Sequence, residues 1–296
     1  MSERGISIGF KTSPQDVDWS TLDAMWAQAG DLDVFESAWL NDHLTNMNPD
    51  PPGPSLEALT LLGTLVHRVP GKFVGHSVLS NTFRHPAVLA KAATVLDLAT
   101  GGRFMLGLGA GWYEGEHGPF GIEMPPIGER IDRLISAVDT IRALFSDAAY
   151  RPTGVTRPDP FYPLAGATNL PPPIRQGGPL IILGGQKPRG IALAARAADG
   201  WVLPGVNAGD VSYFRAKRGE LLAAMERVDR EPTGFRFIGQ INITQDPDWT
   251  AALQTAREFV TAGATDMVLA VRAADGPDGL VMAARRLAEP LREAVG

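Results

Sequence analysis

An aspartate and a histidine stand side by side at positions 42 and 43, soon after the apolar run of residues 33–39. Histidine titrates near neutral pH, so its ring can give or take a proton during a reaction. Residues that follow a buried strand project where the catalytic groups of many α/β enzymes lie. Asp42 and His43 are therefore candidates for a reaction centre. The alternative is a histidine that only caps a loop beside an aspartate.

A second candidate site is the segment "GGQKPRGIALAARAADG" at residues 184–200. Gly184 and Gly185 follow an apolar run and predict a turn with free N–H groups. A helix is expected to begin near Pro188, because proline suits a first helical turn. A helix N-terminus after such a turn attracts phosphate, although it can also be an ordinary surface turn. Two neighbouring cations add positive charge: Lys187 and Arg189.

The run "RFMLGLGAGWYEGEHGPFG" at residues 103–121 has glycine at 107, 109 and 111. A dinucleotide-binding fingerprint would open a helix directly after the strand, with glycines in the order G-x-G-x-x-G. Here the glycines are two apart, and the next helical pattern begins only after a long loop. Glycine within a strand allows a ligand or another backbone to approach closely. A flat ring against the strand end and a tight barrel interior are both compatible with this run.

The elements that carry these residues alternate along the chain. Strands buried on both faces are predicted at residues 6–10, 33–39, 73–79, 103–109, 179–183, 200–203, 235–241 and 266–271. Each strand is followed by a helical pattern, and several of these patterns end at glycine. Strict alternation indicates a parallel sheet, and eight such units predict a closed (β/α)₈ TIM barrel.

Composition limits the classes of function. The net charge is −6 without a basic stripe, which argues against nucleic acid as a partner. The absence of cysteine excludes disulfides and thiolate chemistry, and none of the five histidines forms a metal-spaced pair. No apolar run is long enough for a membrane span, and the N-terminus lacks a signal pattern. We expect one domain over residues 1–296, acting in the cytoplasm.

Two segments are longer than the loops that a minimal barrel needs. Residues 111–127 lengthen the loop after the fourth strand, and residues 147–178 precede the fifth strand and are rich in proline. Long loops inside compact domains are usually functional or disordered. The second insertion could form a lid, an interface or a surface excursion.

Four blocks of the chain resemble one family, the bacterial luciferase-like flavin and deazaflavin oxidoreductases. The blocks are "FESAWLNDHL", "SVLSNTFRHPAVLAKAATVLDLATGGR", "GRFMLGLGAGWYEGEHGPFGIEMPPIGERIDRL" and "LIILGGQKPRGIALAARAADGWVL". More narrowly, they resemble the branch that depends on coenzyme F420. The family's substrates vary widely, so the resemblance does not identify a substrate.

The resemblance implies a cofactor at the C-terminal mouth of the barrel. Similar enzymes hold a non-prolyl cis peptide behind the central ring, which here would be Ser77–Val78. Their strand-2 acid contacts the cofactor and matches Asp42, whereas the histidine near the reactive carbon matches His43. The other residues implied to bind cofactor are Ser80, Ala110, Gly111, Gly184, Gly185, Lys187 and Pro188.

One position departs from the family pattern. Some deazaflavin dehydrogenases have a glutamate directly after the strand-4 turn, where this chain has Trp112. Trp112 could stack on a substrate, and Glu114 could replace the missing acid; Glu116 and His117 are further candidates for the acid. The departure puts a sugar-phosphate dehydrogenase activity in doubt.

The sequence therefore predicts hydride transfer between coenzyme F420 and a small organic substrate, with His43 handling the proton. An FMNH₂-dependent monooxygenase with a partner reductase is the alternative on the same scaffold, with FMN as the cofactor. A non-catalytic flavin-binding barrel is a third possibility, because fold alone does not give activity. By the same resemblance a homodimer is expected.

Overall fold

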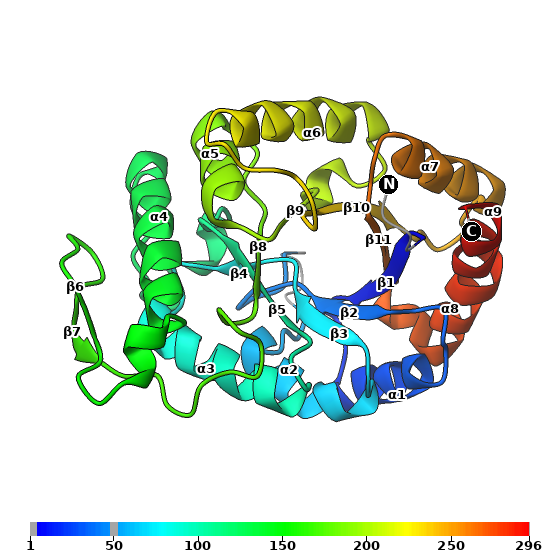
Figure 1. Ribbon diagram of the computed structural model, residues 1–296. Helices are drawn as coiled ribbons and strands as arrows, with labels where there is room; N and C mark the ends of the chain where they lie inside the picture. Colours follow the sequence, from blue (N-terminus) through cyan, green and yellow to red (C-terminus); the bar gives the residue numbers. More distant parts are fainter. Residues whose placement is uncertain (1–4, 48–52, 296) are drawn as a thin grey trace.

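The computed structural model describes residues 5–47 and 53–295. Its strands form a closed parallel barrel surrounded by a ring of helices (Figure 1), which confirms the predicted TIM barrel. The barrel strands are β1 (Ser7–Thr12), β2 (Ser37–Leu40), β3 (Phe73–His76), β4 (Leu79–Ser80), β5 (Phe104–Gly109), β8 (Leu180–Leu183), β9 (Gly200–Val202), β10 (Arg236–Asn242) and β11 (Asp266–Ala270). Strands β3 and β4 are the two parts of the single strand predicted at 73–79, and β3 also pairs with β5 to close the ring.

The helices are α1 (Trp19–Gly30), α2 (Ala58–Leu65), α3 (Pro86–Ala99), α4 (Ile127–Leu144), α5 (Pro188–Ala197), α6 (Val211–Glu226), α7 (Trp249–Thr261), α8 (Gly276–Ala283) and α9 (Glu289–Val295). Side chains that cap the first N–H groups define where several of these helices begin. The carboxylate of Asp18 accepts the N–H of Thr21 at 2.8 Å, and Asp248 accepts that of Ala251 at 3.0 Å. None of the helices in the described part of the chain is long and apolar enough to cross a bilayer.

Strand β2 is shorter than the sequence pattern predicts. The pattern starts at residue 33, whereas the paired strand starts at Ser37. Phe35 instead closes a turn, with its N–H donating to the carbonyl of Leu32 at 3.1 Å. Its ring packs against that of Phe10, 5.4 Å between centroids, in the layer between strands and helices. The apolar character of this run therefore reflects core packing as well as strand pairing.

The barrel interior is filled by one layer of side chains: Trp39, Met105, Ile182, Val202, Ile238 and Val268. Trp39 lies across this interior, and glycine occupies neighbouring positions on both sides. A Cβ at Gly9 would meet the indole nitrogen at 3.1 Å, and one at Gly75 would meet the indole ring at 3.1 Å. The indole thus fills the barrel interior between β1 and β3.

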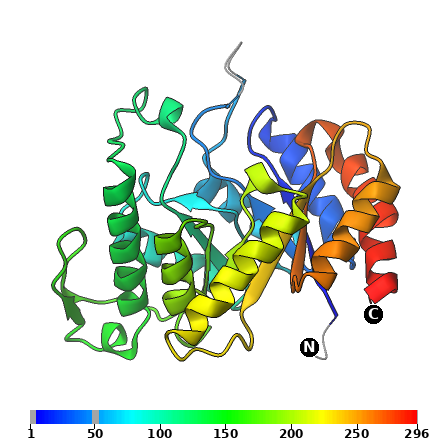
Figure 2. The ribbon, with the colours of Figure 1, turned by 90° about the horizontal axis from the view of Figure 1, so that it is seen from above.

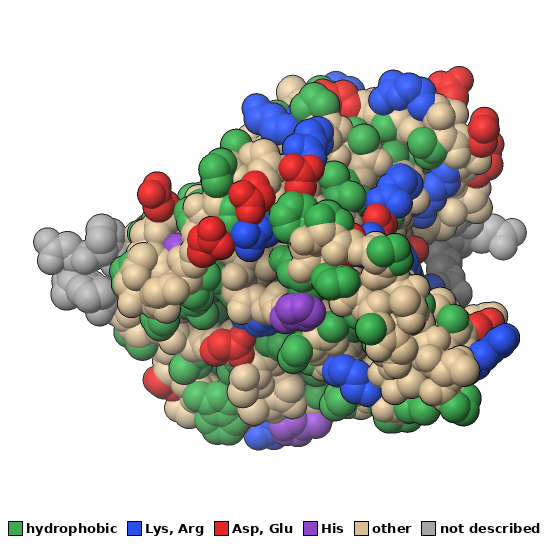
Figure 3. Space-filling model, turned by 90° about the vertical axis from the view of Figure 1, so that its left-hand side faces the viewer, with side chains coloured by type: hydrophobic (Ala, Val, Ile, Leu, Met, Phe, Trp, Pro, Cys, Tyr) green, Lys and Arg blue, Asp and Glu red, His purple; other side chains and the backbone are tan. Residues whose placement is uncertain are grey.

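Residues 147–167 of the insertion lie along the outer face of α4, away from the barrel axis (Figures 1 and 2). The rest returns along α3, where the N–H groups of Ile174 and Arg175 donate to the carboxylate of Asp97. The part along α4 contains an antiparallel hairpin of β6 (Val155–Arg157) and β7 (Leu164–Ala167). Thr140 of α4 holds it by donating to the carbonyl of Tyr162 at 3.0 Å. On the face that includes α4 and this insertion, charged side chains of both signs alternate with apolar ones (Figure 3). This position argues against a lid over the mouth, and both the interface and the surface excursion stay predictions.

Candidate functional site

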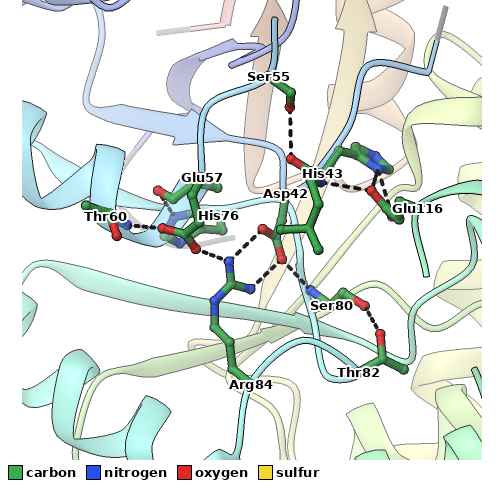
Figure 4. A network of polar contacts seen from close by, with 12 residues as sticks. Asp42, His43, Ser55, Glu57, Thr60, His76, Ser80, Thr82, Arg84 and Glu116 are labelled. Atoms are coloured by element: carbon green, nitrogen blue, oxygen red, sulfur yellow. Dashed lines mark hydrogen bonds and ion pairs between the residues drawn. The ribbon is translucent and has the colours of Figure 1, made fainter. Parts of the chain in front are cut away.

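Asp42 and His43 follow β2 at the C-terminal end of the barrel, and both are buried. The carboxylate of Asp42 accepts from Arg84, with Nη1 at 2.6 Å and Nη2 at 2.8 Å, and from the N–H of Ser80 at 2.8 Å (Figure 4). Asp42 therefore ties the end of β2 to β4 and to the loop before α3. Its contact with a cofactor stays a prediction, and it would have to coexist with these bonds.

Arg84 is a residue of this site that the sequence interpretation missed. Its guanidinium also pairs with the carboxylate of Glu57, the residue that caps α2 (Figure 4). Burial raises the pKa of Glu57, but hydrogen bonds from Arg84 and from Thr60 outweigh it and hold that pKa at about 2. An arginine shared by two carboxylates fixes the end of β2 relative to α2. The only signal in the sequence was its place in the motif "NTFRHP".

His43 is held by Glu116. Nδ1 of the ring lies 3.2 Å from each carboxylate oxygen, and the N–H of Leu44 donates to Oε2 at 2.9 Å (Figure 4). Glu116 is 2% exposed, and His43 is its only ion-pair partner among the described residues. An ionised carboxylate can only accept, so Nδ1 is the ring nitrogen that donates to Glu116 and Nε2 is the nitrogen left for a ligand. No described residue hydrogen-bonds Nε2.

Aromatic side chains of the loop after β5 cover the histidine ring. Trp112 lies edge-on to His43 at 5.8 Å between centroids, and Tyr113 does so at 6.2 Å. Trp112 is 61% exposed, so it can form a wall beside His43 and still meet a ligand. Glu114 is exposed and forms no side-chain bond with the described residues, unlike the buried Glu116. The carboxylate directed at the histidine is therefore Glu116, and Glu114 stays an untested candidate.

The Ser77–Val78 peptide is cis, as the family resemblance predicts. The chain passes from β3 to β4 at this peptide, and the side chain of Val78 lies against the glycines of β5. A Cβ at Gly109 would lie 2.8 Å from Val78 Cγ2, and one at Gly107 would lie 1.7 Å from the carbonyl oxygen of His76. The glycines of β5 therefore leave room for the adjacent strand. Of the two interpretations of this run, the structure supports close packing inside the barrel rather than a ring lying on Gly107 and Gly109.

Ala110 and Gly111 form the turn after β5, and Gly111 has a left-handed φ of 81°. A Cβ there would meet the hydroxyls of Ser80 at 2.7 Å and Thr82 at 2.9 Å. These hydroxyls lie 2.7 Å apart, and Thr82 continues to Nε2 of His117 at 2.8 Å. Ser80 thus belongs to a network that fixes the loop after β5 to β4. Whether its hydroxyl also reaches a cofactor is untested.

The turn after β8 carries the predicted phosphate site. Helix α5 begins at Pro188, and its N-cap, Lys187, makes no side-chain capping bond, so the first N–H groups are uncapped. Lys187 is exposed, but Arg189 is paired with Asp132 of α4. Uncapped N–H groups and one unpaired cation suit an anionic group. The contribution expected of Arg189 stays a prediction, because its exposed guanidinium is also paired with Asp132 of α4.

Gly185 is required for a different reason than the sequence suggested. A glycine in such a turn often serves to adopt a positive φ, but Gly185 is not among the glycines with positive φ. Instead, a Cβ would lie 2.8 Å from Cα of Gly190, and a Cβ at Gly190 would lie 2.9 Å from Cα of Gly185. The turn and the first turn of α5 are therefore packed backbone to backbone. Gly184 borders the mouth, since a Cβ there would contact Val78 at 3.4 Å.

Residues 18–292 match the luciferase-like monooxygenase family. The chain belongs to this family. One relative is the F420-dependent glucose-6-phosphate dehydrogenase of Kribbella flavida, 29% identical over 85% of this chain and 73% of that protein. The phthiodiolone/phenolphthiodiolone dimycocerosates ketoreductase of Mycobacterium tuberculosis is 32% identical over 67% of this chain, which spans only 54% of that protein.

Solved structures share the luciferase-like fold. An F420-dependent secondary alcohol dehydrogenase, solved with an F420–acetone adduct, superposes with a TM-score of 0.77 over 96% of this chain and 98% of its own. Its sequence is 20% identical, so the likeness concerns the barrel and not the site. The family and its barrel are established for this chain.

Proposed function

We propose that this protein is a coenzyme F420-dependent oxidoreductase that transfers a hydride between the deazaflavin and a small organic substrate at the mouth of the barrel. The observation that carries the proposal is the buried His43–Glu116 pair, in which Nδ1 is occupied and Nε2 has no hydrogen-bond partner within residues 5–47 and 53–295. Such a ring can exchange a proton with a substrate oxygen. The relatives whose names include F420 support the choice of cofactor.

The residues of the mouth fit a deazaflavin. In this proposal Ser77, Val78, Ala110 and Gly111, at the ends of neighbouring strands, would border the deazaflavin ring. The uncapped start of α5, with Gly184, Gly185 and Lys187 before Pro188, fits the phosphate. When bound, the deazaflavin accepts or delivers the hydride.

The chain's own residues handle the proton. When a substrate alcohol is oxidised, Nε2 of His43 accepts the hydroxyl proton. When a carbonyl is reduced, the protonated ring returns that proton to the new oxygen. Glu116 keeps Nδ1 protonated and stabilises the charged ring while it holds the extra proton. Trp112 and Tyr113 limit access of water to the ring.

Binding experiments test the choice of cofactor. Fluorescence titration should show micromolar or tighter binding of F420 and weaker binding of FMN. Tight preferential binding of FMN, with oxygen uptake on reduction, would favour a monooxygenase served by a partner reductase. Binding without turnover on alcohols, enones, imines and quinones would favour a non-catalytic flavin-binding barrel. Because Trp112 replaces the glutamate of the sugar-phosphate dehydrogenases, we expect a substrate other than glucose 6-phosphate.

The assembly and the location of the enzyme are also part of the proposal. We expect a homodimer in the cytoplasm. Light scattering coupled to gel filtration measures the mass in solution, and a monomeric mass would contradict the first expectation.

A further inference from the structure

Lys11 is a cation at the mouth of the barrel that the reaction proposed above does not use. It lies at the C-terminal end of β1, in register with Trp39 of β2 and Ala270 of β11. Side chains in register on neighbouring parallel strands share a face, and Trp39 faces the interior. Lys11 therefore faces the inside of the ring at the C-terminal end of β1, next to Trp39.

The ammonium group of Lys11 has one hydrogen-bond partner among the described residues. Nζ donates to Oε1 of Gln240 at 2.5 Å, across β11 on strand β10. Gln240 is 1% exposed and is itself fixed, because its amide nitrogen donates to the carbonyl of Leu203. An ammonium carries three donors, so two of them are left for a ligand.

Carboxylates do not compensate this charge. No described carboxylate lies within ion-pair distance of Lys11, and burial lowers its pKa to about 8. Lys72, at the opposite end of the barrel, is a useful contrast. Its Nζ donates to the carbonyls of Leu32 at 3.0 Å and Phe35 at 2.8 Å, which is the pattern of a structural lysine. Lys11 is only partly buried and faces the mouth without such partners.

The position of Lys11 separates it from the expected cofactor phosphate. Around the ring, β1 lies four strands from β8 in either direction, so it is opposite the turn that precedes α5. The tip of Lys11 also points away from β2, toward Gln240 and Gly205, where a Cβ would be 3.9 Å from Nζ. The amine therefore lies across the mouth from the turn that would hold the cofactor phosphate.

We propose that Lys11, oriented by Gln240, binds an anionic oxygen of the substrate, a carboxylate or a phosphate, on the β10–β1 side of the mouth. This inference rests on the proposed function only in naming the ligand as substrate. The binding group itself can be tested without the cofactor.

The first experiment uses the unmodified protein. Lysines are labelled by reductive methylation at pH 8, with and without inorganic phosphate or succinate, and each site is quantified by peptide mass spectrometry. An anion within about 4 Å raises a neighbouring lysine's pKa by about one unit or more, so labelling of Lys11 should fall about fivefold. Lys72 and the surface lysine Lys91 provide internal controls whose labelling should not change.

The second experiment uses variants. Lys11→Met removes the charge with little change in length, and Lys11→Arg keeps the charge. With a hydroxy acid and its methyl ester as paired substrates, Lys11→Met should raise KM for the acid about 10- to 100-fold, the usual range for a hydrogen bond to a charged group. KM for the ester and the Kd for F420 should stay unchanged, and Lys11→Arg should retain most of the preference for the acid.

The outcomes separate the possible sources of the anion. Protection of Lys11 by phosphate or succinate, even if F420 does not bind, supports the anion site independently of the cofactor. Protection by F420 alone, with weaker F420 binding in Lys11→Met, would assign the amine to the cofactor and overturn the inference. Unchanged labelling of Lys11 in all these anions would overturn it as well.

Discussion

The carboxylate of Glu116 lies 3.2 Å from Nδ1 of His43, although the two residues are 73 positions apart in the chain. The same carboxylate accepts the N–H of Leu44 at 2.9 Å, so it holds both the ring and the backbone that carries it. This contact joins the loop after β5 to the loop after β2. It determines which ring nitrogen faces the mouth.

Glu116→Gln should lower turnover about 100-fold, because an amide does not enforce the Nδ1–H tautomer or stabilise a charged ring. The Kd for F420 should change little. Nitrogen-15 NMR of the imidazole should show loss of the single neutral tautomer, which a purely structural role would not alter. Glu114→Gln, at an exposed residue of the same loop, is the comparison, and a loss of turnover there instead would assign the acid to Glu114. Parental turnover and tautomer in Glu116→Gln would show that His43 needs no such partner.

Replacing His43 itself should separate rate from affinity. His43→Ala should slow turnover by about 10²–10⁴, the usual range for a positioned acid or base, with F420 affinity retained. The measurement is steady-state kinetics on the substrate that the screen identifies, together with fluorescence titration of F420. If turnover stays near the parental value, His43 is only a wall of the site.

Asp42→Asn should cost about 3 kcal/mol of unfolding free energy, because it leaves part of the charge of a buried arginine unpaired. The side chain of Asp42 is 1% exposed and that of Arg84 is 13% exposed. Weaker F420 binding is also expected, since β4 loses its link to β2. Asp132→Asn is the control: it breaks an aspartate–arginine pair whose side chains are about half exposed and should cost less than about 1 kcal/mol. Urea unfolding measures the loss of unfolding free energy in both variants. Equal losses would contradict the assignment of Asp42–Arg84 as a buried, stabilising pair.

Gly185→Ala should weaken F420 binding and destabilise the fold by about 1–3 kcal/mol, because its Cβ would press on Gly190 at 2.8 Å. Valine should be worse than alanine. Gly219→Ala in α6 is the matched substitution: nothing lies within 4 Å of its Cβ, and it should stabilise by about 0.5–1 kcal/mol. Unchanged F420 affinity in Gly185→Ala would show that the cofactor phosphate binds at another place.

His76 should make the fold sensitive to mild acid. Its ring is fully buried, Nε2 bonds the carbonyl of Ala58 at 3.1 Å, and burial lowers its pKa to about 4. The unfolded chain binds this proton below about pH 6.5 while the folded chain does not, so stability falls as the pH drops from about 6.5 to about 4. The loss attributable to His76 is about 3 kcal/mol over that range.

His76→Gln keeps a donor for the carbonyl of Ala58 and does not titrate, so it serves as the comparison. Urea midpoints of both proteins should be measured from pH 7 to pH 4. The difference in urea midpoint between the parental protein and His76→Gln should narrow or reverse as the pH falls. Parallel curves would show that other groups cause the acid sensitivity.

The sequence was sufficient to predict the barrel because its evidence is local and repeated. Apolar runs alternate with helical patterns through the whole chain, and β3 to β5 carry motifs long enough to identify the family. The cis peptide at Ser77–Val78 followed from one of those motifs. Even the errors in the fold were local: Phe35 is apolar because it is buried in a turn, and a pattern of burial cannot distinguish that turn from a strand.

Only the tertiary structure decided which side chains act together. Glu116 reaches His43 because the strand ends of a closed barrel bring β2 and β5 loops to one mouth, and Arg84 joins Asp42 to Glu57 for the same reason. Lys11 became notable only when register placed it inside the ring without a carboxylate. Pairings of this kind depend on distance and burial rather than on spacing in the chain, so the sequence determined the scaffold and the structure determined the charges at its mouth.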